Sequence, residues 1–399
     1  MFPFPGTPDR MPHFTNTIMN IPTMHTRPVV FRLTNSLHYG GVASRLRAVL
    51  PLLLDEFEMH VVTYRTPGAF AQELADKGVR VHHLPIPTKW SPTGIVRLAR
   101  LLRGHGVSVL HNHSFSANVT GALAGALAGT PVRIGQIHTL KSHWYDNPAH
   151  RAKQRIEEML IHSALSTRVL HVSRESRDYF AAQMPLAAPK FEVLHNGVDF
   201  SALAPRKNAR QLRAELGIPA RARVIGNVGR ITGCKRLDML LSMAARALAL
   251  DPDMVFVIVG GEAGHADGLR RQAAELGIAD KVIFPGETPY PGDYYNIFDA
   301  FLFTSPPGSE GMPGAVLEAA SFGMPIVAIR TDTLEEMAEW YDGFRFITEG
   351  CDPAHELAAA LAAPRPDPAR LRAHFSIQAM ADRTRALYHR LLQHPTPRT

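Results

Sequence analysis

The sequence predicts an α/β protein built from two doubly wound, Rossmann-like domains that face each other across a cleft. In the first half, short β-rich runs alternate with helical patterns, which is typical of parallel strands covered by helices on both faces. The same alternation restarts near residue 223, after a stretch rich in Arg, Asn, Ala and Pro. A chain of 399 residues is also too long for one ordinary core, since a domain takes about 150 residues.

The elements of the first half follow from their apolar patterns. Runs rich in β-branched and other apolar residues predict strands at residues 28–33, 59–64, 79–84, 107–111 and 132–137. The segments between them predict helices at residues 42–54, 69–77, 95–102 and 119–128. The last of these is short and rich in small residues, so we expect a buried helix and not a membrane span.

The second half repeats this scheme. Strands are predicted at residues 224–228, 255–259, 282–284, 300–303 and 326–329, and helices at residues 237–250, 268–276 and around Glu318. A Pro-rich segment at residues 363–368 ends the domain, and an amphipathic helix at residues 368–392 is expected to cross back to the first domain. The predicted division is a disordered leader (1–27), a first domain (28–199), a linker (200–222), a second domain (223–367) and a C-terminal helix (368–399).

Composition excludes several classes of protein. Two cysteines, Cys234 and Cys351, exclude a disulfide framework and a cysteine-rich zinc site, and the reducing cytoplasm is the expected location. No apolar run reaches the roughly 18 residues that a membrane-spanning helix needs. The net charge of +7 comes without a block of Lys or Arg, so we expect no nucleic-acid partner.

Basic residues nevertheless gather in one part of the first half, among apolar residues and some acids. They are Lys141, Arg151, Lys153, Arg155, Arg168, Arg174 and Arg177. Such a face can rest on anionic lipid head groups, which would place the protein at the inner face of the plasma membrane. An ordinary solvated helix face is the alternative.

The most informative segment is residues 305–325, where two carboxylates lie on either side of a Gly/Pro-rich turn that enters a predicted helix. Gly311 and Gly314 can bring bare backbone N–H groups close to a ligand, and the helix N-terminus attracts oxygen-rich groups. Glu318, about two turns beyond Glu310, can accept the paired hydroxyls of a ribose. The alternative is a helix start whose acids only complement the helix dipole.

Other candidate residues follow predicted strand ends and therefore face the cleft. Gly40-Gly41 can form a backbone cradle for a diphosphate. In the second half, Gly229-Arg230 and Lys235 can neutralise the charges of a nucleoside diphosphate, and Gly260-Gly261 forms a third close-approach turn. Solvated loop cations are the alternative for Arg230 and Lys235.

Three histidines also follow strands: His111, His113 and His138. Alternation along a strand puts His111 and His113 on one face, so a metal pair is one interpretation. No Asp or Glu nearby completes a ligand set, and structural histidines are a second interpretation. We favour a third, in which His113 contacts the transferring group and His138 shapes the acceptor side.

A nicotinamide-dependent enzyme is the main rival for a doubly wound fold. It needs a G-x-G-x-x-G turn and an acid about 20 residues further on. The segment Gly40 to Arg45 lacks this glycine pattern, and the second strand ends at Arg65 without an acid. The sequence therefore disfavours this class.

The ordered set of motifs resembles a known family. The series is Gly40-Gly41, Leu110 to His113, Pro131 to Ile134 with His138, Val172-Ser173, His195 to Asp199, Val228 to Arg230 with Lys235, Val259-Gly260, Phe284 to Gly286 and Glu310 to Glu318. From about Val29 to Ala328 the chain resembles the GT4-type retaining glycosyltransferases of GT-B fold. Within that family it is most similar to bacterial enzymes of capsular, exopolysaccharide or O-antigen synthesis.

This resemblance implies a nucleotide-sugar site on the second domain. Arg230 and Lys235 would bind the donor diphosphate, and Glu318 would hold the ribose. The sugar hydroxyls would be held by Glu310 with the backbone of Gly311, Met312, Pro313 and Gly314. The base pocket would be lined by the backbone of Phe284 to Gly286, beside the turn at Gly260.

The first domain would then be the acceptor side. The resemblance implies that His113 lies beside the donor sugar, that Gly40-Gly41 approaches the phosphates and that His138 shapes the acceptor side. The implied catalytic residues are His113, Glu310, Arg230 and Lys235. Since the two cations can replace a metal, no cofactor and no divalent cation are expected.

The chain departs from the family pattern at two places. Arg236 stands where the family usually has a Gly after the basic Lys, and Thr331 to Glu335 lacks the Gly-Gly pair that often precedes the later Glu. The second departure affects the outer contacts to the donor sugar. It leaves the diphosphate and ribose assignments unchanged.

The expected activity is retaining transfer of a hexose or N-acetylhexosamine, from a UDP-linked donor by family habit, to a glycan or polyprenyl-linked acceptor in cell-surface polysaccharide synthesis. Since the set holds no good enzymic nucleophile, front-face departure of the nucleoside diphosphate is expected, driven by orientation and charge stabilisation. A sugar-nucleotide epimerase and a non-catalytic nucleotide-sugar-binding subunit are the alternatives.

Overall fold

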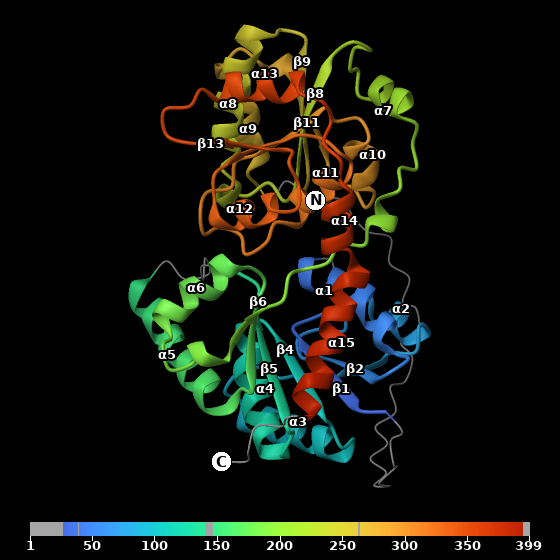
Figure 1. Ribbon diagram of the computed structural model, residues 1–399, viewed down its shortest axis with the longest axis vertical. Helices are drawn as coiled ribbons and strands as arrows, with labels where there is room; N and C mark the ends of the chain where they lie inside the picture. The colour runs from blue at the N-terminus through green and yellow to red at the C-terminus, as the bar shows by residue number, and fades with distance from the viewer. Residues whose placement is uncertain (1–26, 39, 140–146, 262–263, 394–399) are drawn as a thin grey trace.

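The computed structural model describes residues 27–38, 40–139, 147–261 and 264–393, and it shows two lobes that each contain one parallel sheet (Figure 1). The first sheet has the strand order β3-β2-β1-β4-β5-β6-β7, and the second has the order β10-β9-β8-β11-β12-β13. The predicted α/β fold with two doubly wound domains is therefore confirmed. In each sheet the strand order reverses beside the first strand, and ligands of such folds bind at the carboxyl edge there.

The first lobe follows the predicted elements closely. Its strands are β1 (Val29–Thr34), β2 (Glu58–Thr63), β3 (Arg80–His83), β4 (Val109–His113), β5 (Val132–Ile137), β6 (Arg168–His171) and β7 (Phe191–Val193). Its helices are α1 (Gly41–Val49), α2 (Ala71–Asp76), α3 (Pro92–Gly104), α4 (Phe115–Ala128), α5 (Pro148–Leu165) and α6 (Arg174–Gln183). The predicted helix at 42–54 is divided, because α1 gives way to the 3₁₀ helix η1 (Leu50–Leu53), which has Pro51 in its first turn.

The sheet of the second lobe begins at residue 223. Its strands are β8 (Arg223–Val228), β9 (Met254–Val259), β10 (Val282–Gly286), β11 (Ala300–Phe303), β12 (Ile326–Ile329) and β13 (Phe344–Ile347). Its main helices are α8 (Leu237–Leu250), α9 (Ala266–Glu275), α10 (Pro291–Tyr295), α11 (Gly314–Ser321), α12 (Asp332–Ala338) and α13 (Pro353–Ala362).

Helices cover both faces of the second sheet, and the central strand β9 is apolar at every position. In β9, Val255, Val257 and Val259 belong to one core, and the alternate residues Phe256 and Ile258 belong to the other. The first core includes side chains from α11 and α12, and the second includes side chains from α8, α9 and α13. A strand that is apolar at every position is typical of a parallel sheet buried on both faces.

The segment predicted as a linker, residues 200–222, is not a bare connection. It contains the 3₁₀ helix η3 (Phe200–Leu203) and helix α7 (Ala209–Glu215). Leu212, Ile218 and Ala222 are buried in a core of the second lobe, because their spacing presents an apolar face to it. The predicted leader, apart from Arg27, lies outside the described residues.

The C-terminal segment also differs from its prediction. The single helix expected at residues 368–392 is divided into α14 (Ala369–Phe375) and α15 (Ile377–Gln393) by the extended residue Ser376. The backbone of Val198 accepts from Ile377 N at 2.9 Å and donates to Phe375 O at 2.8 Å. Helix α14 packs on α11 of the second lobe and α15 packs on α1 of the first, so the two crossings between lobes lie side by side (Figure 1).

Within the described part of the chain, every helix is too short or too polar to cross a membrane.

Candidate active site

The floor of the site on the second lobe consists of three strand ends joined through their backbones. Gly229 N donates to Val259 O at 2.9 Å, and Gly260 N donates to Gly286 O at 2.9 Å. A Cβ atom on Gly260 would lie 1.8 Å from the carbonyl oxygen of Gly229, so only glycine fits at this position. Gly229, Gly260 and Gly286, which all belong to motifs selected from the sequence, therefore lie next to one another at the carboxyl edge of the sheet.

Lys235 and Glu310 form an ion pair beside this floor. Lys235 ends the 3₁₀ helix η4 (Gly233–Lys235), and Glu310 lies in the loop before α11. The same Glu310 oxygen accepts from Ser305 Oγ at 2.9 Å, and Thr304 Oγ1 donates to Lys235 O at 2.9 Å. The two predicted catalytic residues are thus brought together by the loop that follows β11.

Arg230 has a different environment. It follows Gly229 with an exposed side chain, and no carboxylate of the described residues pairs with it. A guanidinium exposed two residues past a strand end can bind an incoming anion without first losing a protein partner.

Glu318 lies in the second turn of α11. The buried Met312 and the N-cap residue Pro313 precede this helix in the sequence. Its Oε2 accepts from Tyr295 Oη at 2.9 Å. Burial raises the pKa of Glu318, whereas the Tyr295 hydrogen bond and the charge of Arg45 lower it. Among the described residues nothing donates to Glu318 Oε1, which leaves that oxygen for a ligand hydroxyl.

In the first lobe, the buried Arg32 and His113 and the half-buried His138 are linked by hydrogen bonds. Arg32 Nη1 donates to His113 Nε2 at 3.0 Å, and His113 Nδ1 lies 3.1 Å from His138 Nε2. Burial lowers the pKa of His113 well below its usual value and that of His138 to about 3, so both rings are neutral. Because Arg32 can only donate, His113 must carry its proton on Nδ1 and donate it to His138.

This proton order has a consequence for His138. A neutral His138 that accepts at Nε2 carries its proton on Nδ1. That atom is buried and has no partner among the described residues. The series of hydrogen bonds that starts at Arg32 therefore ends at the Nδ1–H group of His138, which lies next to the cleft and has no acceptor among the described residues.

His111 is a structural histidine. Its Nδ1 lies 2.8 Å from Tyr388 Oη on α15, and its Nε2 lies 3.0 Å from Gln136 Oε1. With both ring nitrogens engaged, His111 and His113 do not form the metal pair considered from the sequence. Their rings are stacked instead, with centroids 4.6 Å apart.

The two lobes meet at Gly311. A Cβ atom there would lie 2.5 Å from the carbonyl oxygen of His138 and 2.8 Å from Val172 Cγ2. This bare backbone thus faces the first lobe, whereas a Cβ on Gly314 would have ordinary contact, 3.8 Å from Glu318 Oε1. The predicted donor loop and the predicted acceptor-side histidine are neighbours across the cleft.

Sequence reasoning missed Arg45. Its guanidinium folds over Gly41, where an added Cβ would lie 3.3 Å from Arg45 Nη2. Burial lowers the pKa of Arg45 to about 10, and the charge of Glu318 on the opposite lobe opposes this shift. An Arg one helical turn after the Gly40-Gly41 pair was the available signal.

Phe284 does not point into the site. Its half-buried ring packs with the core below α8 and α9 and lies under the Arg270 guanidinium, 5.3 Å from it. The Phe284 ring is therefore turned away from the site, and a contact between the backbone of Phe284 to Gly286 and a nucleotide base stays a prediction.

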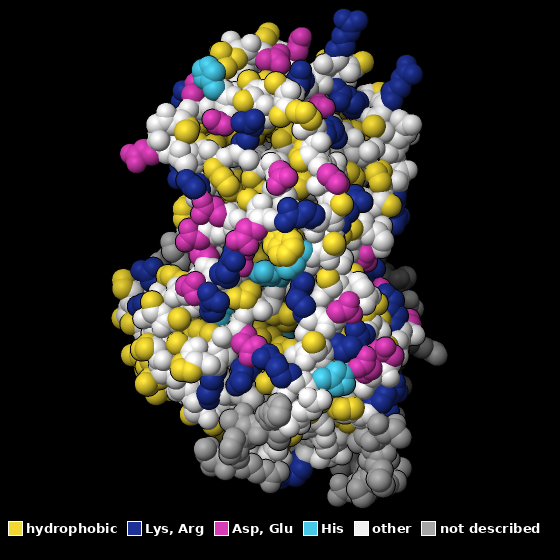
Figure 2. Space-filling model, in the orientation of Figure 1, with side chains coloured by type: hydrophobic (Ala, Val, Ile, Leu, Met, Phe, Trp, Pro, Cys, Tyr) yellow, Lys and Arg dark blue, Asp and Glu magenta, His cyan; other side chains and the backbone are white. Residues whose placement is uncertain are grey.

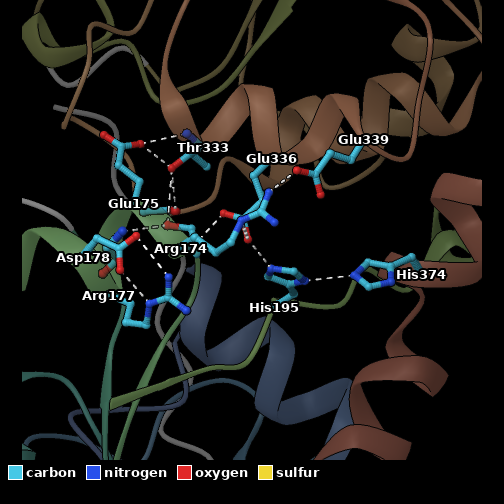
Figure 3. A network of polar contacts seen from close by, with 12 residues as sticks. Arg174, Glu175, Arg177, Asp178, His195, Thr333, Glu336, Glu339 and His374 are labelled. Atoms are coloured by element: carbon cyan, nitrogen blue, oxygen red, sulfur yellow. Dashed lines mark hydrogen bonds and ion pairs between the residues drawn. The ribbon is translucent and has the colours of Figure 1, made fainter. Parts of the chain in front are cut away.

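A polar network joins the lobes on one side of the cleft (Figure 3). Glu336 on α12 accepts from the backbone of Arg174 at 2.7 Å and lies 2.7 Å from His195 Nε2. The adjoining cavity of about 670 Å³ is lined mostly by carboxylates from α6 and α12.

Comparison with known proteins decides the family. Residues 39–202 match the Glycosyltransferase Family 4 domain, and residues 208–379 match the domain of glycosyl transferases group 1. A D-inositol 3-phosphate glycosyltransferase of Catenulispora acidiphila is 30% identical over 325 residues, which cover 75% of this chain and 76% of that protein. The chain belongs to the GT4-type glycosyltransferases.

Two further comparisons concern the sequence and the fold of this GT4-type chain. An Escherichia coli UDP-Gal:alpha-D-GlcNAc-diphosphoundecaprenol alpha-1,3-galactosyltransferase is 27% identical over 240 residues, covering 58% of this chain and 60% of that protein. The crystal structure of Anabaena Alr3699/HepE in complex with UDP and glucose shares the fold, with a TM-score of 0.76 and 19% identity over 92% of this chain and 100% of that one. The predicted family and fold are both confirmed.

Proposed function

We propose that this GT4-type enzyme transfers a hexose or N-acetylhexosamine from a UDP-linked donor, with retention, to a glycan or lipid-linked acceptor in cell-surface polysaccharide synthesis. The observation that carries the proposal is the Lys235–Glu310 pair beside the exposed Arg230, at the carboxyl edge of β8 and opposite the histidines of the first lobe. The Escherichia coli relative, whose name specifies a UDP-sugar and a lipid-linked acceptor, supports this choice of substrates.

The donor would lie with its diphosphate between Arg230 and Lys235. Its ribose would bind the unused oxygen of Glu318, and its sugar would face Glu310 and the N-terminus of α11. The backbone N–H groups at that terminus suit the oxygen atoms of the donor. Since Lys235 is already paired, donor binding would share its ammonium between Glu310 and the phosphate.

The reaction would use charge stabilisation and orientation. The bond between the sugar C1 and the β-phosphate oxygen breaks, and the acceptor oxygen bonds to C1 on the same face. The acceptor hydroxyl proton passes to the departing phosphate. Arg230 and Lys235 stabilise the negative charge that grows there, so we propose that turnover requires no divalent cation.

The acceptor would approach along the first lobe, where the buried His138 Nδ1 supplies an N–H donor. A lipid-linked acceptor would suit the outer face of α5, because Ile156 and Leu160 on α5 and Leu186 just after α6 are each more than half exposed. Figure 2 shows hydrophobic side chains gathered over this part of the lobe.

The basic cluster adds less to this face than the sequence suggested. Arg168, Arg174 and Arg177 are each paired with a carboxylate, so their charge is partly neutralised. Arg151 and Lys153 lie on α5, and Lys141 lies outside the described residues. We therefore propose peripheral contact with an anionic membrane through α5.

The deciding experiment is calorimetric titration of the protein with UDP, GDP and NAD, repeated on Glu318→Ala and on a control, Glu349→Ala, at an exposed position. We expect selective binding of UDP, weakened by about 1.5–3 kcal/mol in Glu318→Ala, the range for a hydrogen bond to a charged group. Equal binding by wild type and Glu318→Ala would show that the ribose site is placed wrongly. Binding of NAD alone would reject the proposal.

Product analysis then tests the chemistry. Incubation with UDP-sugars and no acceptor distinguishes the transferase from an epimerase, which would convert the donor sugar by itself. With an acceptor, NMR of the new linkage shows whether the anomeric configuration is retained. Turnover that persists in EDTA would support metal independence, and turnover restored only by a divalent cation would contradict it.

A further inference from the structure

Three histidines of the first lobe meet away from the cleft. His60 lies on β2, His82 lies on the neighbouring strand β3, and His105 caps the C-terminus of α3. One ring nitrogen from each lies within 4.8 Å of the others. His60 is fully buried, and His82 and His105 are half-buried, so the cluster is accessible from solvent on one side.

The spacing of the ring nitrogens suits a single metal ion. Tetrahedral zinc holds imidazole nitrogens at about 2.0–2.1 Å, which places two such ligands about 3.3 Å apart. His60 Nδ1 and His82 Nε2 are 2.9 Å apart, and the His105 ring lies edge-on to both. Small side-chain rotations would therefore give three-histidine coordination.

The surroundings resemble those of a built metal site. His60 Nε2 lies 2.9 Å from Glu58 Oε1, and Glu58 in turn pairs with Arg80. A carboxylate on the far nitrogen of a ligating histidine orients the ring and directs its other nitrogen to the metal. The ring of Phe31 stacks on His60 and His82, with centroids 4.3 and 5.4 Å away, and holds both rings in place.

We propose that His60, His82 and His105 bind one divalent transition-metal ion, with zinc as the expected ion and water as its fourth ligand. Three imidazoles favour such an ion over Mg²⁺ or Ca²⁺, which prefer oxygen ligands. The ion would join the edge strand β3 and its neighbour β2 to the end of α3. Because α3 runs antiparallel to the strands, its C-terminus lies at the edge opposite the cleft, so the role is structural and separate from glycosyl transfer.

The test uses the full chain without a histidine tag, stripped with a chelator and then titrated with ZnCl₂. We expect about one zinc ion per chain, measured by calorimetry and by elemental analysis after gel filtration. At a free zinc concentration 100 times the dissociation constant, the melting temperature of the first lobe should rise by about 5–10 °C. No binding at micromolar zinc would overturn the proposal.

The variants locate the site. His82→Gln should abolish stoichiometric binding, and Glu58→Gln should weaken it about 10- to 100-fold, as expected for a residue that orients a ligand. The control is His83→Gln on the same strand, whose ring instead contacts Thr63 and which should bind zinc like wild type. Equal zinc binding by His82→Gln and wild type would show that the ion binds elsewhere.

A spectroscopic readout covers the case in which His82→Gln fails to fold. Cobalt added to the stripped wild-type chain should give the intense visible absorption of a tetrahedral ion. His105→Gln replaces a half-buried side chain, and this variant should lose that absorption. A weak, octahedral spectrum in the wild type would contradict three-histidine coordination.

Discussion

At the scale of single residues, the cleft is organised by charges that face one another from opposite lobes. Arg45 on α1 and Glu318 on α11 influence each other's pKa, although 273 positions separate them in the numbering. Tyr295 holds one oxygen of Glu318, and Ser305 holds the oxygen of Glu310 that pairs with Lys235. Each predicted donor-binding carboxylate is thus oriented by a hydroxyl that the sequence analysis did not select.

The first prediction concerns Lys235. Lys235→Ala should lower kcat about 10²- to 10³-fold, because charge grows on the leaving phosphate in the transition state, and should weaken donor binding much less. Steady-state kinetics and calorimetry together measure both effects. Lys207→Ala, which removes an exposed lysine paired with Glu215, is the control. An unchanged rate would remove Lys235 from the mechanism.

The second prediction concerns Glu158, a carboxyl group buried on α5. Burial raises its pKa to about 8, and the nearby Lys89 opposes this shift. The folded state therefore keeps this proton to a higher pH than the unfolded state does, and the associated stability is complete below the unfolded pKa of 4.5 and is lost as pH rises through 8.

Glu158→Gln should accordingly be more stable than wild type at high pH. The difference in unfolding free energy should grow from near zero at pH 5 to the order of 1–4 kcal/mol at pH 9. Urea unfolding across this range measures it, with the exposed Glu349→Gln as a control that should follow wild type. A difference independent of pH would show that burial does not protonate Glu158.

At the scale of elements, the loop before α11 is placed by backbone contacts. Its Gly311 packs against the carbonyl oxygen of His138, while Thr333 on α12 contacts the same loop from behind. The predicted helix at residues 368–392 is divided at Ser376 because the chain must cross between lobes there and pair with Val198. Strands β6, β7 and β13 were not predicted, and each contains a charged residue (Arg168, Glu192 or Arg345) that interrupts its short apolar run.

The third prediction follows from Gly311. Gly311→Ala should lower kcat/KM at least 10-fold, because its methyl group would lie 2.5 Å from His138 O and force the lobes apart. The matched control is Gly314→Ala, whose methyl group would have ordinary contacts. Similar kinetics for the two variants would show that close approach at Gly311 is not needed.

At the scale of the whole molecule, two features set the relative position of the lobes. Segments near Val198 and Ser376 cross side by side, and the polar network of Figure 3 joins α6 to α12. Glu336 is almost fully buried and receives contacts from Arg174 and His195, both from the first half of the chain. Its loss would leave these donors without their shared acceptor.

The fourth prediction is that Glu336→Ala loosens the pairing of the lobes. We expect a larger radius of gyration in small-angle X-ray scattering and an unfolding free energy lower by about 1–3 kcal/mol, the cost of unsatisfied buried partners. Glu339→Ala is the control, because Glu339 is half exposed and contacts only the outer part of the network. Scattering curves that match wild type would show that the crossings alone hold the lobes.

The sequence by itself determined the α/β class, the division into two similar halves and the family. Strand periodicity, glycine turns and the order of the motifs can all be read along the chain, without knowing which segments come into contact. It also selected Lys235, Glu310 and Glu318, since their positions after strand ends follow from parallel topology. The structure brings Lys235 and Glu310 into contact, although their roles in catalysis remain predictions.

Only the tertiary structure decided which polar side chains meet. His60, His82 and His105 come from different elements, as do Arg32, His113 and His138, and Arg45 and Glu318 come from different lobes. It also decided that His111 is bound to Tyr388 and is unavailable to a metal. Such contacts depend on strand order, helix packing and the angle between lobes, which are properties of the folded chain and not of any local sequence pattern.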